Sequence, residues 1–210
     1  VGVAQLVLNV PDLDAAARPY AAAGWATSFR CDRIPNHSAK HRFQATPRTE
    51  LDMVHLTKAD ATAVEITSYA DGPPAGATVY EPFDDGIRVR ACDLPASERF
   101  WAALGFVEQA PGILEARAML PAWRLRVELQ AADGPCPRTS VDAEGCVLVT
   151  VLTTAIETEL DRLSATGLLV QSSRPWQESI AKRMTTVAMV EGPSGELVEL
   201  LQAPRASRDE

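Results

Sequence analysis

The chain repeats one short sequence pattern, and this repeat limits the folds that it can adopt. Residues 11–25 are echoed by residues 92–106, and a weaker third copy covers residues 155–168. An internal repeat of this length indicates a fold built from copies of one supersecondary unit. The matched pairs are Asp12 with Asp93, Leu13 with Leu94, Tyr20 with Trp101, Gly24 with Gly105, and Trp25 with Phe106.

Each copy is followed by the same kind of tripeptide, in which a glutamate stands between two apolar residues. Alternation of apolar and polar residues is typical of a strand with one buried face. The three glutamates therefore occupy equivalent positions, and they are the first place to look for chemistry. The tripeptides are Val64-Glu65-Ile66, Val127-Glu128-Leu129 and Val198-Glu199-Leu200.

The residues around the first copy predict a β-α-β-β-β unit. An apolar, β-branched run at residues 3–10 predicts a strand. Asp12 is placed to cap the following helix, and Gly24 is placed to end it. Three further strands are predicted at residues 25–30, 51–57 and 63–68. The second unit is predicted as strand 87–91, helix 95–104 and strands 106–109, 113–119 and 123–130, and the third as strand 146–152, helix 156–166 and strands 168–172, 183–190 and 196–202.

Composition excludes several classes of partner. A net charge of −8 and a pI near 5.0 argue against binding to nucleic acid or to an anionic membrane. No apolar run approaches the length of a membrane span, and no signal peptide is visible. The cysteines, Cys31, Cys92, Cys136 and Cys146, are far apart and form no close pair. We therefore expect reduced thiols in a cytoplasmic protein.

Three segments together resemble a known superfamily. They are residues 10–25, residues 93–106 and the closing stretch Gly192-Pro193-Ser194-Gly195-Glu196-Leu197-Val198-Glu199-Leu200. The chain resembles the vicinal oxygen chelate superfamily, which contains glyoxalase I, bleomycin-resistance proteins and extradiol dioxygenases. The closing stretch departs from the family pattern at Gly192, where an aspartate is usual. The resemblance implies an α+β fold of three βαβββ units, with pairs of units forming curved sheets that close a cup around a ligand.

The resemblance also implies a domain organisation. Residues 84–205 have the length of one two-unit glyoxalase-like domain, and residues 1–80 form a half-domain. An unpaired half leaves apolar strand faces in water, so we expect a homodimer in which two first units complete a cup. Two alternatives stay open: residues 1–80 pack on the C-terminal domain of the same chain, or the first and second units share a cup.

Metal ligands in this superfamily come from the first and last strands of each unit. In the first unit these positions are Gln5 and Glu65, a pair that suits a divalent cation such as nickel, manganese, iron, magnesium or zinc. In the homodimer, both chains would contribute this pair to one site. The equivalent first-strand positions in the other units are Gly86 and Leu148, and neither can bind a metal.

Several other residues are candidates for catalysis or ligand binding. Glu199 and Glu128 are candidate general bases, and each is equally well explained as a carboxylate that bonds a neighbour. His55 shares a strand face with Met53, so it is a candidate acid or base if that face lines the cup. Trp123 and Trp176 are candidate walls for an aromatic ligand, with core packing as the alternative. His37 and His41 are expected to be solvated.

Two functions follow from these residues. The first is a small-molecule enzyme of specialised metabolism, with isomerase, epimerase or lyase chemistry on an oxygenated metabolite, in which a divalent metal stabilises an enolate-like state. The alternative is a metal-free protein that binds an antibiotic or an aromatic metabolite, as bleomycin-resistance proteins do. No first-strand position carries histidine, so the iron triad of oxygen-activating members is not expected.

Overall fold

The secondary structure follows the expected units closely in the first two segments. The computed structural model describes residues 2–72, 74–83, 86–117, 124–180 and 183–202. In the third segment two short strands precede the last hairpin. The elements are β1 (Gly2–Asn9), α1 (Leu13–Ala22), β2 (Ala26–Pro35), the 3-10 helix η1 (Ser38–Phe43), β3 (Glu50–Thr57), β4 (Ala63–Tyr69), β5 (Tyr80–Phe83), β6 (Gly86–Ala91), α2 (Leu94–Ala103), β7 (Val107–Ala110), β8 (Ile113–Arg117), β9 (Arg124–Ala131), β10 (Gly145–Thr153), α3 (Ile156–Ala165), β11 (Gln171–Ser172), β12 (Trp176–Ile180), β13 (Arg183–Glu191) and β14 (Leu197–Gln202).

The predicted helix caps are confirmed. The Asp12 carboxylate accepts a hydrogen bond from the Ala15 backbone N–H at 2.8 Å, and Asp93 does the same for Ala96 at 2.9 Å. These bonds satisfy N–H groups that have no partner inside the helix. Gly24 follows α1 with a φ of 83°, a conformation that glycine adopts at least cost. None of the helices in the described part of the chain has the length and apolar character that spanning a membrane requires.

The first and third segments together form one nine-stranded sheet. Its strand order is β11-β13-β14-β10-β1-β4-β3-β2, with β12 also paired to β13. The two segments join where β1 runs antiparallel to β10. The prediction that the second and third units close one cup was therefore wrong. The first unit is completed by the third unit of the same chain, so it does not require a second chain for this purpose. The alternative in which residues 1–80 pack within the same chain matches this pairing.

The second segment forms a separate five-stranded sheet in the order β5-β6-β9-β8-β7. Its first strand, β6, pairs on one side with β9 and on the other with the short strand β5. Because β5 covers the edge of β6, this unit cannot join another unit through its first strand. β5 contains Pro82, which lacks a backbone donor and so weakens the new edge as a template for pairing.

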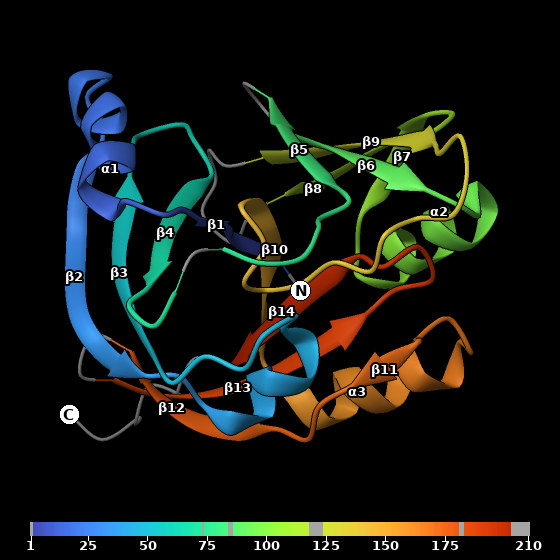
Figure 1. Ribbon diagram of the computed structural model, residues 1–210. Coiled ribbons are helices and arrows are strands. Elements are labelled where there is room, and N and C mark those ends of the chain that lie inside the picture. The colour runs from blue at the N-terminus through green and yellow to red at the C-terminus, as the bar shows by residue number, and fades with distance from the viewer. Residues whose placement is uncertain (1, 73, 84–85, 118–123, 181–182, 203–210) are drawn as a thin grey trace, which may run out of the picture.

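Two apolar clusters cover one face of the large sheet, one under α1 and one beneath α2 and the second sheet. Figure 1 shows α1 lying against β3 and β4, and the apolar contacts there join Leu13 to Val54, Val64 and Ile66. A larger core joins the second sheet and α2 to the outer face of β10, β13 and β14. Trp101, at the repeat position of Tyr20, is fully buried in that core. The outer face of the large sheet is thus covered, and its other face is left for the site.

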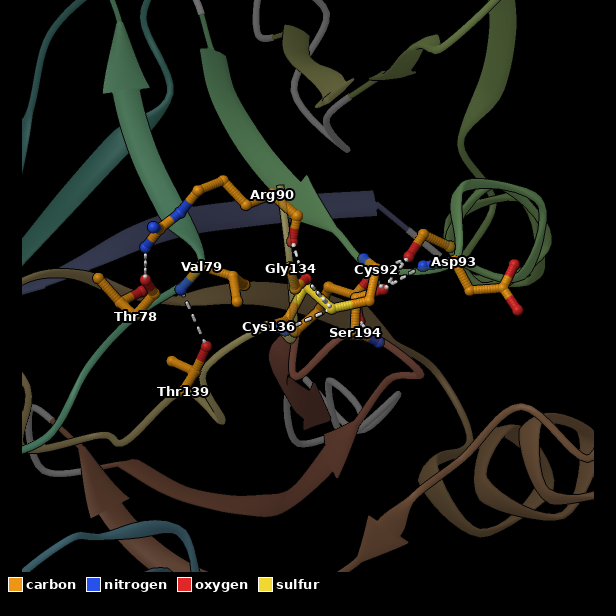
Figure 2. The surroundings of a disulfide bond; sticks show 11 residues. Thr78, Val79, Arg90, Cys92, Asp93, Gly134, Cys136, Thr139 and Ser194 are labelled. Carbon is orange, nitrogen blue, oxygen red and sulfur yellow. Dashed lines mark hydrogen bonds between the residues drawn. A yellow bond between two sulfur atoms is a disulfide. The ribbon is translucent and has the colours of Figure 1, made fainter. Parts of the chain in front are cut away.

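Cys92 and Cys136 form a disulfide bond, so the prediction that all cysteines are reduced was wrong for this pair. The Cα atoms lie 5.6 Å apart, although 44 residues separate them in the sequence. Figure 2 shows the bond beside Ser194, whose hydroxyl accepts a hydrogen bond from the Cys92 backbone N–H at 3.0 Å. Local spacing could not predict this pair, since the fold brings the two cysteines together. Cys31 and Cys146 are free.

Loss of this disulfide should destabilise the protein. Cys92→Ser/Cys136→Ser is expected to lower the free energy of unfolding by roughly 2–4 kcal/mol, because the bond closes a long loop in the unfolded chain. Urea denaturation of the double variant and of the unaltered protein measures the difference. Cys31→Ser is the control and should change little. Four titratable thiols in the denatured, unreduced protein would contradict the disulfide itself.

Candidate functional site

Four side chains from the central strands of the large sheet lie together on one face. The face is defined here as the cup face. In the register, Gln5 on β1 pairs with Thr150 on β10, and Thr150 pairs with Glu199 on β14. Glu65 on β4 lies diagonally beside Gln5, since it pairs with Val7. Thr150 stands opposite Gln5 without being its equivalent in the third unit. Gln5 lies two residues before the strand partner of Glu65, and Leu148 lies two residues before the strand partner of Glu199, so the equivalent position remains Leu148.

Each buried carboxylate on this face receives a hydrogen bond from the neighbouring strand. The Gln5 amide Nε2 donates to Glu65 Oε2 at 2.7 Å, and the Thr150 hydroxyl donates to Glu199 Oε2 at 3.1 Å. All four residues are at most 9% exposed. In both the first and the third unit, a first-strand side chain thus hydrogen-bonds a last-strand glutamate. The donor is an amide in the first unit and a hydroxyl in the third.

A lysine that the sequence analysis did not single out lies among these carboxylates. Lys40 sits on η1, between β2 and β3, and its side chain is only 13% exposed. Its Nζ atom is 3.3 Å from Glu178 Oε1 and 3.9 Å from Glu199 Oε1. Buried lysines are rare unless they are paired, so this contact is the central electrostatic feature of the face.

The segment that carries Lys40 is packed into the protein. Phe43 is 2% exposed and belongs to an apolar cluster with Val141, Leu148 and Leu197. The Asp142 carboxylate accepts hydrogen bonds from the backbone N–H groups of the two residues after Gln44, at 2.7 and 3.1 Å. Residues 36–48 therefore form an anchored insertion, and the position of Lys40 is fixed by that anchoring.

The histidines expected to be solvated in this segment are partly buried. The ring of His37 stacks on that of Trp176, with centroids 5.2 Å apart. His41 Nε2 lies 3.1 Å from the backbone oxygen of Arg48. The segment is polar because it packs against a charged site. Its polarity alone does not distinguish it from an exposed loop, so the sequence did not predict its burial.

The charges on the cup face perturb one another. Burial, together with the nearby Glu199, raises the pKa of Glu65 from 4.5 to about 7, although Lys40 and Gln5 oppose the shift. Burial also raises the pKa of Glu199. For Lys40, burial lowers the pKa of the ammonium, but Glu178 and Glu199 outweigh it and hold that pKa above its usual value. At neutral pH, Lys40 is thus a fixed cation and Glu65 is poised between its two forms.

A small cavity of about 30 Å³ adjoins this cluster. It has room for about one water molecule. Met53, which was predicted to contact a ligand, is buried and lines it. The polar side chains lining the cavity are Lys40, Glu65, Thr67, Tyr69, Glu178 and Glu199.

The other predicted site residues lie in different places. His55 pairs in register with Glu65, but its ring stacks on Phe29 at 4.9 Å, and burial lowers its pKa. Glu128 lies on the second sheet, where it forms ion pairs with Arg126 at 2.7 Å and Arg88 at 3.5 Å. Its repeat position is that of Glu65, but the second sheet is separate, so it does not join the cluster.

Of the two predicted tryptophans, one is near the cluster. The Trp176 indole Nε1–H donates to Glu178 Oε2 at 3.0 Å, and the Lys40 ammonium lies 6.0 Å from the ring centroid. Trp176 is 7% exposed, so it supports the charged cluster rather than forming an open wall. Trp123 lies outside the described residues.

The side chains on the cup face do not fit a divalent metal as they are placed. The Gln5 amide turns its nitrogen, and not its oxygen, toward Glu65. The Lys40 ammonium stands close to Glu199, where it repels a second cation. Among the described residues, no three His, Cys, Asp or Glu side chains are grouped to hold a metal ion together. The predicted ligands Gln5 and Glu65 are neighbours, but the Lys40 ammonium already supplies positive charge to this cluster.

A larger cavity of about 430 Å³ lies apart from the cup face, between the first unit and the second sheet. Leu6 and Leu8 reach it from the outer face of β1. Tyr20 and Trp25, whose rings meet edge to face at 5.4 Å, form an aromatic wall. Asp60, Thr62 and Arg124 supply polar groups to the same lining.

Comparison with known proteins shows similarity in structure alone. No protein-family model matches the chain, and no curated protein matches its sequence. A crystal structure of a glyoxalase I mutant from Zea mays matches with a TM-score of 0.63 and 13% identity, over 96% of this chain and 93% of that one. A mutant methylmalonyl-CoA epimerase from Streptomyces coelicolor, in complex with 2-nitronate-propionyl-CoA, matches over 98% and 96% of the two chains, with 12% identity and a low TM-score of 0.43.

Replacing Glu65 with glutamine should change how stability depends on pH. A folded-state pKa of about 7, raised from 4.5, means that the fold favours the protonated acid. Stability from this group is therefore present below the unfolded pKa and is lost as pH rises through about 7. Glutamine does not titrate, so the Glu65→Gln variant should not lose this stability as pH rises. The free energy of unfolding of the variant minus that of the unaltered protein should therefore be greater at pH 8 than at pH 5, by roughly 1–3 kcal/mol.

Urea denaturation at both pH values measures this change. Glu108→Gln, at an exposed position, is the matched control and should show no such trend. The same relative stability of Glu65→Gln at pH 5 and pH 8 would show that Glu65 does not titrate in this range.

Proposed function

We propose that this chain, which has the fold of the vicinal oxygen chelate superfamily, is an enzyme that moves a proton on a small oxygenated compound. The observation that carries the proposal is the ammonium of Lys40 beside Glu178 and Glu199, with Glu65 of β4 lining the same small cavity. A fixed cation next to a carboxylate that titrates near neutral pH is suited to acid–base catalysis. The reaction class is isomerisation, epimerisation or elimination through an enolate.

Glu65 is the proposed general base. Its carboxylate would take a proton from the carbon next to a carbonyl group, and the electron pair of that C–H bond would move onto the carbonyl oxygen. A pKa of about 7 suits this step, because the group is partly deprotonated at neutral pH and still accepts a proton readily. The hydrogen bond from Gln5 fixes the orientation of the carboxylate.

Lys40 is the proposed stabiliser of the enolate oxygen. Its ammonium remains charged because Glu178 and Glu199 hold its pKa above the usual value. In a site closed to water, such a charge stabilises a developing oxyanion more than it does in solvent. Return of the proton to a different carbon or face gives an isomer or epimer, and loss of a leaving group gives the product of a lyase.

Glu199 is the proposed second proton carrier. It occupies the position in the third unit that Glu65 occupies in the first, and burial raises its pKa as well. Two carboxylates from opposite halves of the sheet would approach a substrate from different sides, as the epimerisation of one carbon requires. Both come from a single chain, so this site does not need a homodimer.

Substrate entry requires movement of the insertion at residues 36–48. The present cavity of about 30 Å³ accepts a water molecule and nothing larger. Lys40 lies on this insertion, so binding and placement of the cation would be coupled.

Proton transfer can be measured without knowing the natural substrate. In deuterated water, the protein is expected to catalyse deuterium incorporation next to the carbonyl group in some member of a panel of small hydroxyaldehydes, hydroxyketones and acyl thioesters. Glu65→Gln should lower that rate at least about 100-fold, since it removes the base. Mass spectrometry of the recovered compounds gives the rate.

Glu108→Gln is the control and should exchange at the unaltered rate. Exchange that is equally fast in Glu65→Gln would remove Glu65 from the reaction. A complete lack of exchange across the panel would count against this reaction class.

The second candidate is a metal-free protein that binds an antibiotic or aromatic metabolite. The cavity of about 430 Å³ favours it, because that volume and its apolar and aromatic lining are typical of small-molecule sites. Anilinonaphthalene sulfonate, a fluorescent aromatic anion, is expected to bind there, and Trp25→Ala should weaken its binding by about tenfold, or roughly 1.4 kcal/mol. Val107→Ala, at an exposed apolar position, is the control. Equal binding by both variants would place the probe elsewhere.

A further inference from the structure

We propose that the ammonium of Lys40 takes the place that a divalent cation would occupy on the cup face of this fold. The unaltered chain then binds no divalent metal there, and loss of the ammonium creates a site made by Gln5, Glu65, Thr150 and Glu199. This inference concerns metal binding and stands whether or not the chain catalyses the proposed proton transfer.

The positions of the four side chains support the inference. They lie on four neighbouring strands, β4, β1, β10 and β14, where the first and third units meet. Gln5 and Glu65 come from the first and last strands of the first unit, and Thr150 and Glu199 come from the first and last strands of the third unit. The Lys40 ammonium reaches the same face, 3.9 Å from Glu199 Oε1.

The charges point in the same direction. Three carboxylates, the buried Glu65 and Glu199 and the partly buried Glu178, interact electrostatically with the Lys40 ammonium. If all three are ionised, the cluster carries a formal charge of −2, because three negative charges face one positive charge. Buried charge of one sign is costly, so this cluster attracts positive charge strongly. A divalent cation in place of the ammonium would bring the formal charge to −1.

The donor atoms also suit a cation once the ammonium is gone. The four side chains offer two carboxylates, one amide oxygen and one hydroxyl, all of them oxygen donors. Hard cations such as Mg²⁺ and Mn²⁺ prefer oxygen ligands. Rotation of the Gln5 amide would turn its oxygen toward the cation, and the hydroxyl of Thr150 already points toward Glu199.

The insertion makes the lysine a permanent occupant. Phe43 is buried three residues after Lys40, and the Asp142 carboxylate binds the backbone just beyond it. A free ion leaves its site at a rate set by its affinity, whereas this ammonium leaves only if residues 36–48 unpack. Metal in solution therefore competes with a tethered cation, which has a high effective concentration.

Metal binding by a Lys40→Met variant tests the inference. Methionine keeps the apolar stem and removes the charge. Titration with Mn²⁺, followed by the electron paramagnetic resonance signal of the free ion, should show one bound ion per chain in Lys40→Met. The dissociation constant of Mn²⁺ should be at least about tenfold lower for the variant than for the unaltered protein. Mn²⁺ should also raise the melting temperature of the variant but not that of the unaltered protein.

Two further variants identify the site. Lys40→Met/Glu199→Gln should lose the added Mn²⁺ binding, because it removes one carboxylate donor. Lys58→Met, which removes an exposed lysine, is the matched control and should behave as the unaltered protein. If Lys40→Met does not fold, as judged by circular dichroism, Lys40→Gln serves instead, because its amide can still bond Glu178.

Either of two results would overturn the inference. One is stoichiometric Mn²⁺ binding by the unaltered protein that Glu65→Gln abolishes. The other is a folded Lys40→Met or Lys40→Gln variant that binds Mn²⁺ no better than Lys58→Met. Neither result decides the proposed function, which the deuterium exchange of the unaltered protein and of Glu65→Gln tests separately.

Discussion

The antiparallel pairing of β1 with β10 determines most of what this protein can do. It joins the first and third units into one sheet and places Gln5 opposite Thr150. The last strands of the same two units, β4 and β14, then bring Glu65 and Glu199 onto the same face. Without this pairing the carboxylates would lie on separate surfaces in water, where neither their raised pKa values nor their attraction for a cation would arise.

A buried charged cluster is costly unless its charges are matched, and here a matching positive charge comes from outside the sheet. The insertion at residues 36–48 contributes Lys40, and β12 contributes Glu178. Each gains a partner in the other at 3.3 Å. The apolar packing of Phe43 holds the lysine in place, so part of the free energy of burying that aromatic ring offsets the desolvation of an ammonium. Packing and electrostatics are therefore coupled in one segment.

The sequence predicted the elements better than their partners. Alternating apolar residues and the capping aspartates located the strands and helices of the first two segments, since these signals are local. Which units pair is decided by contacts between distant strands, and the strand that blocks the second unit, β5, is four residues long and lies in a stretch that reads as a loop. The equivalence of Glu65 and Glu199 was visible in the repeat. Lys40 and Glu178 were not, because both lie in segments outside the repeated pattern, and only the folded chain brings them to the site.

The order of the units along the chain has a consequence for how the protein is made. The second unit is complete in sequence between residues 86 and 131, and it interrupts the two units that share a sheet. During synthesis, the open edge of β1 must wait for more than half of the chain before β10 emerges from the ribosome. Pairing over such a sequence separation is slow, and an unpaired strand edge is prone to association with other chains. The middle unit, whose own first strand is soon enclosed by β5 and β9, is thus suited to fold early and to keep the growing chain ordered while the first unit waits.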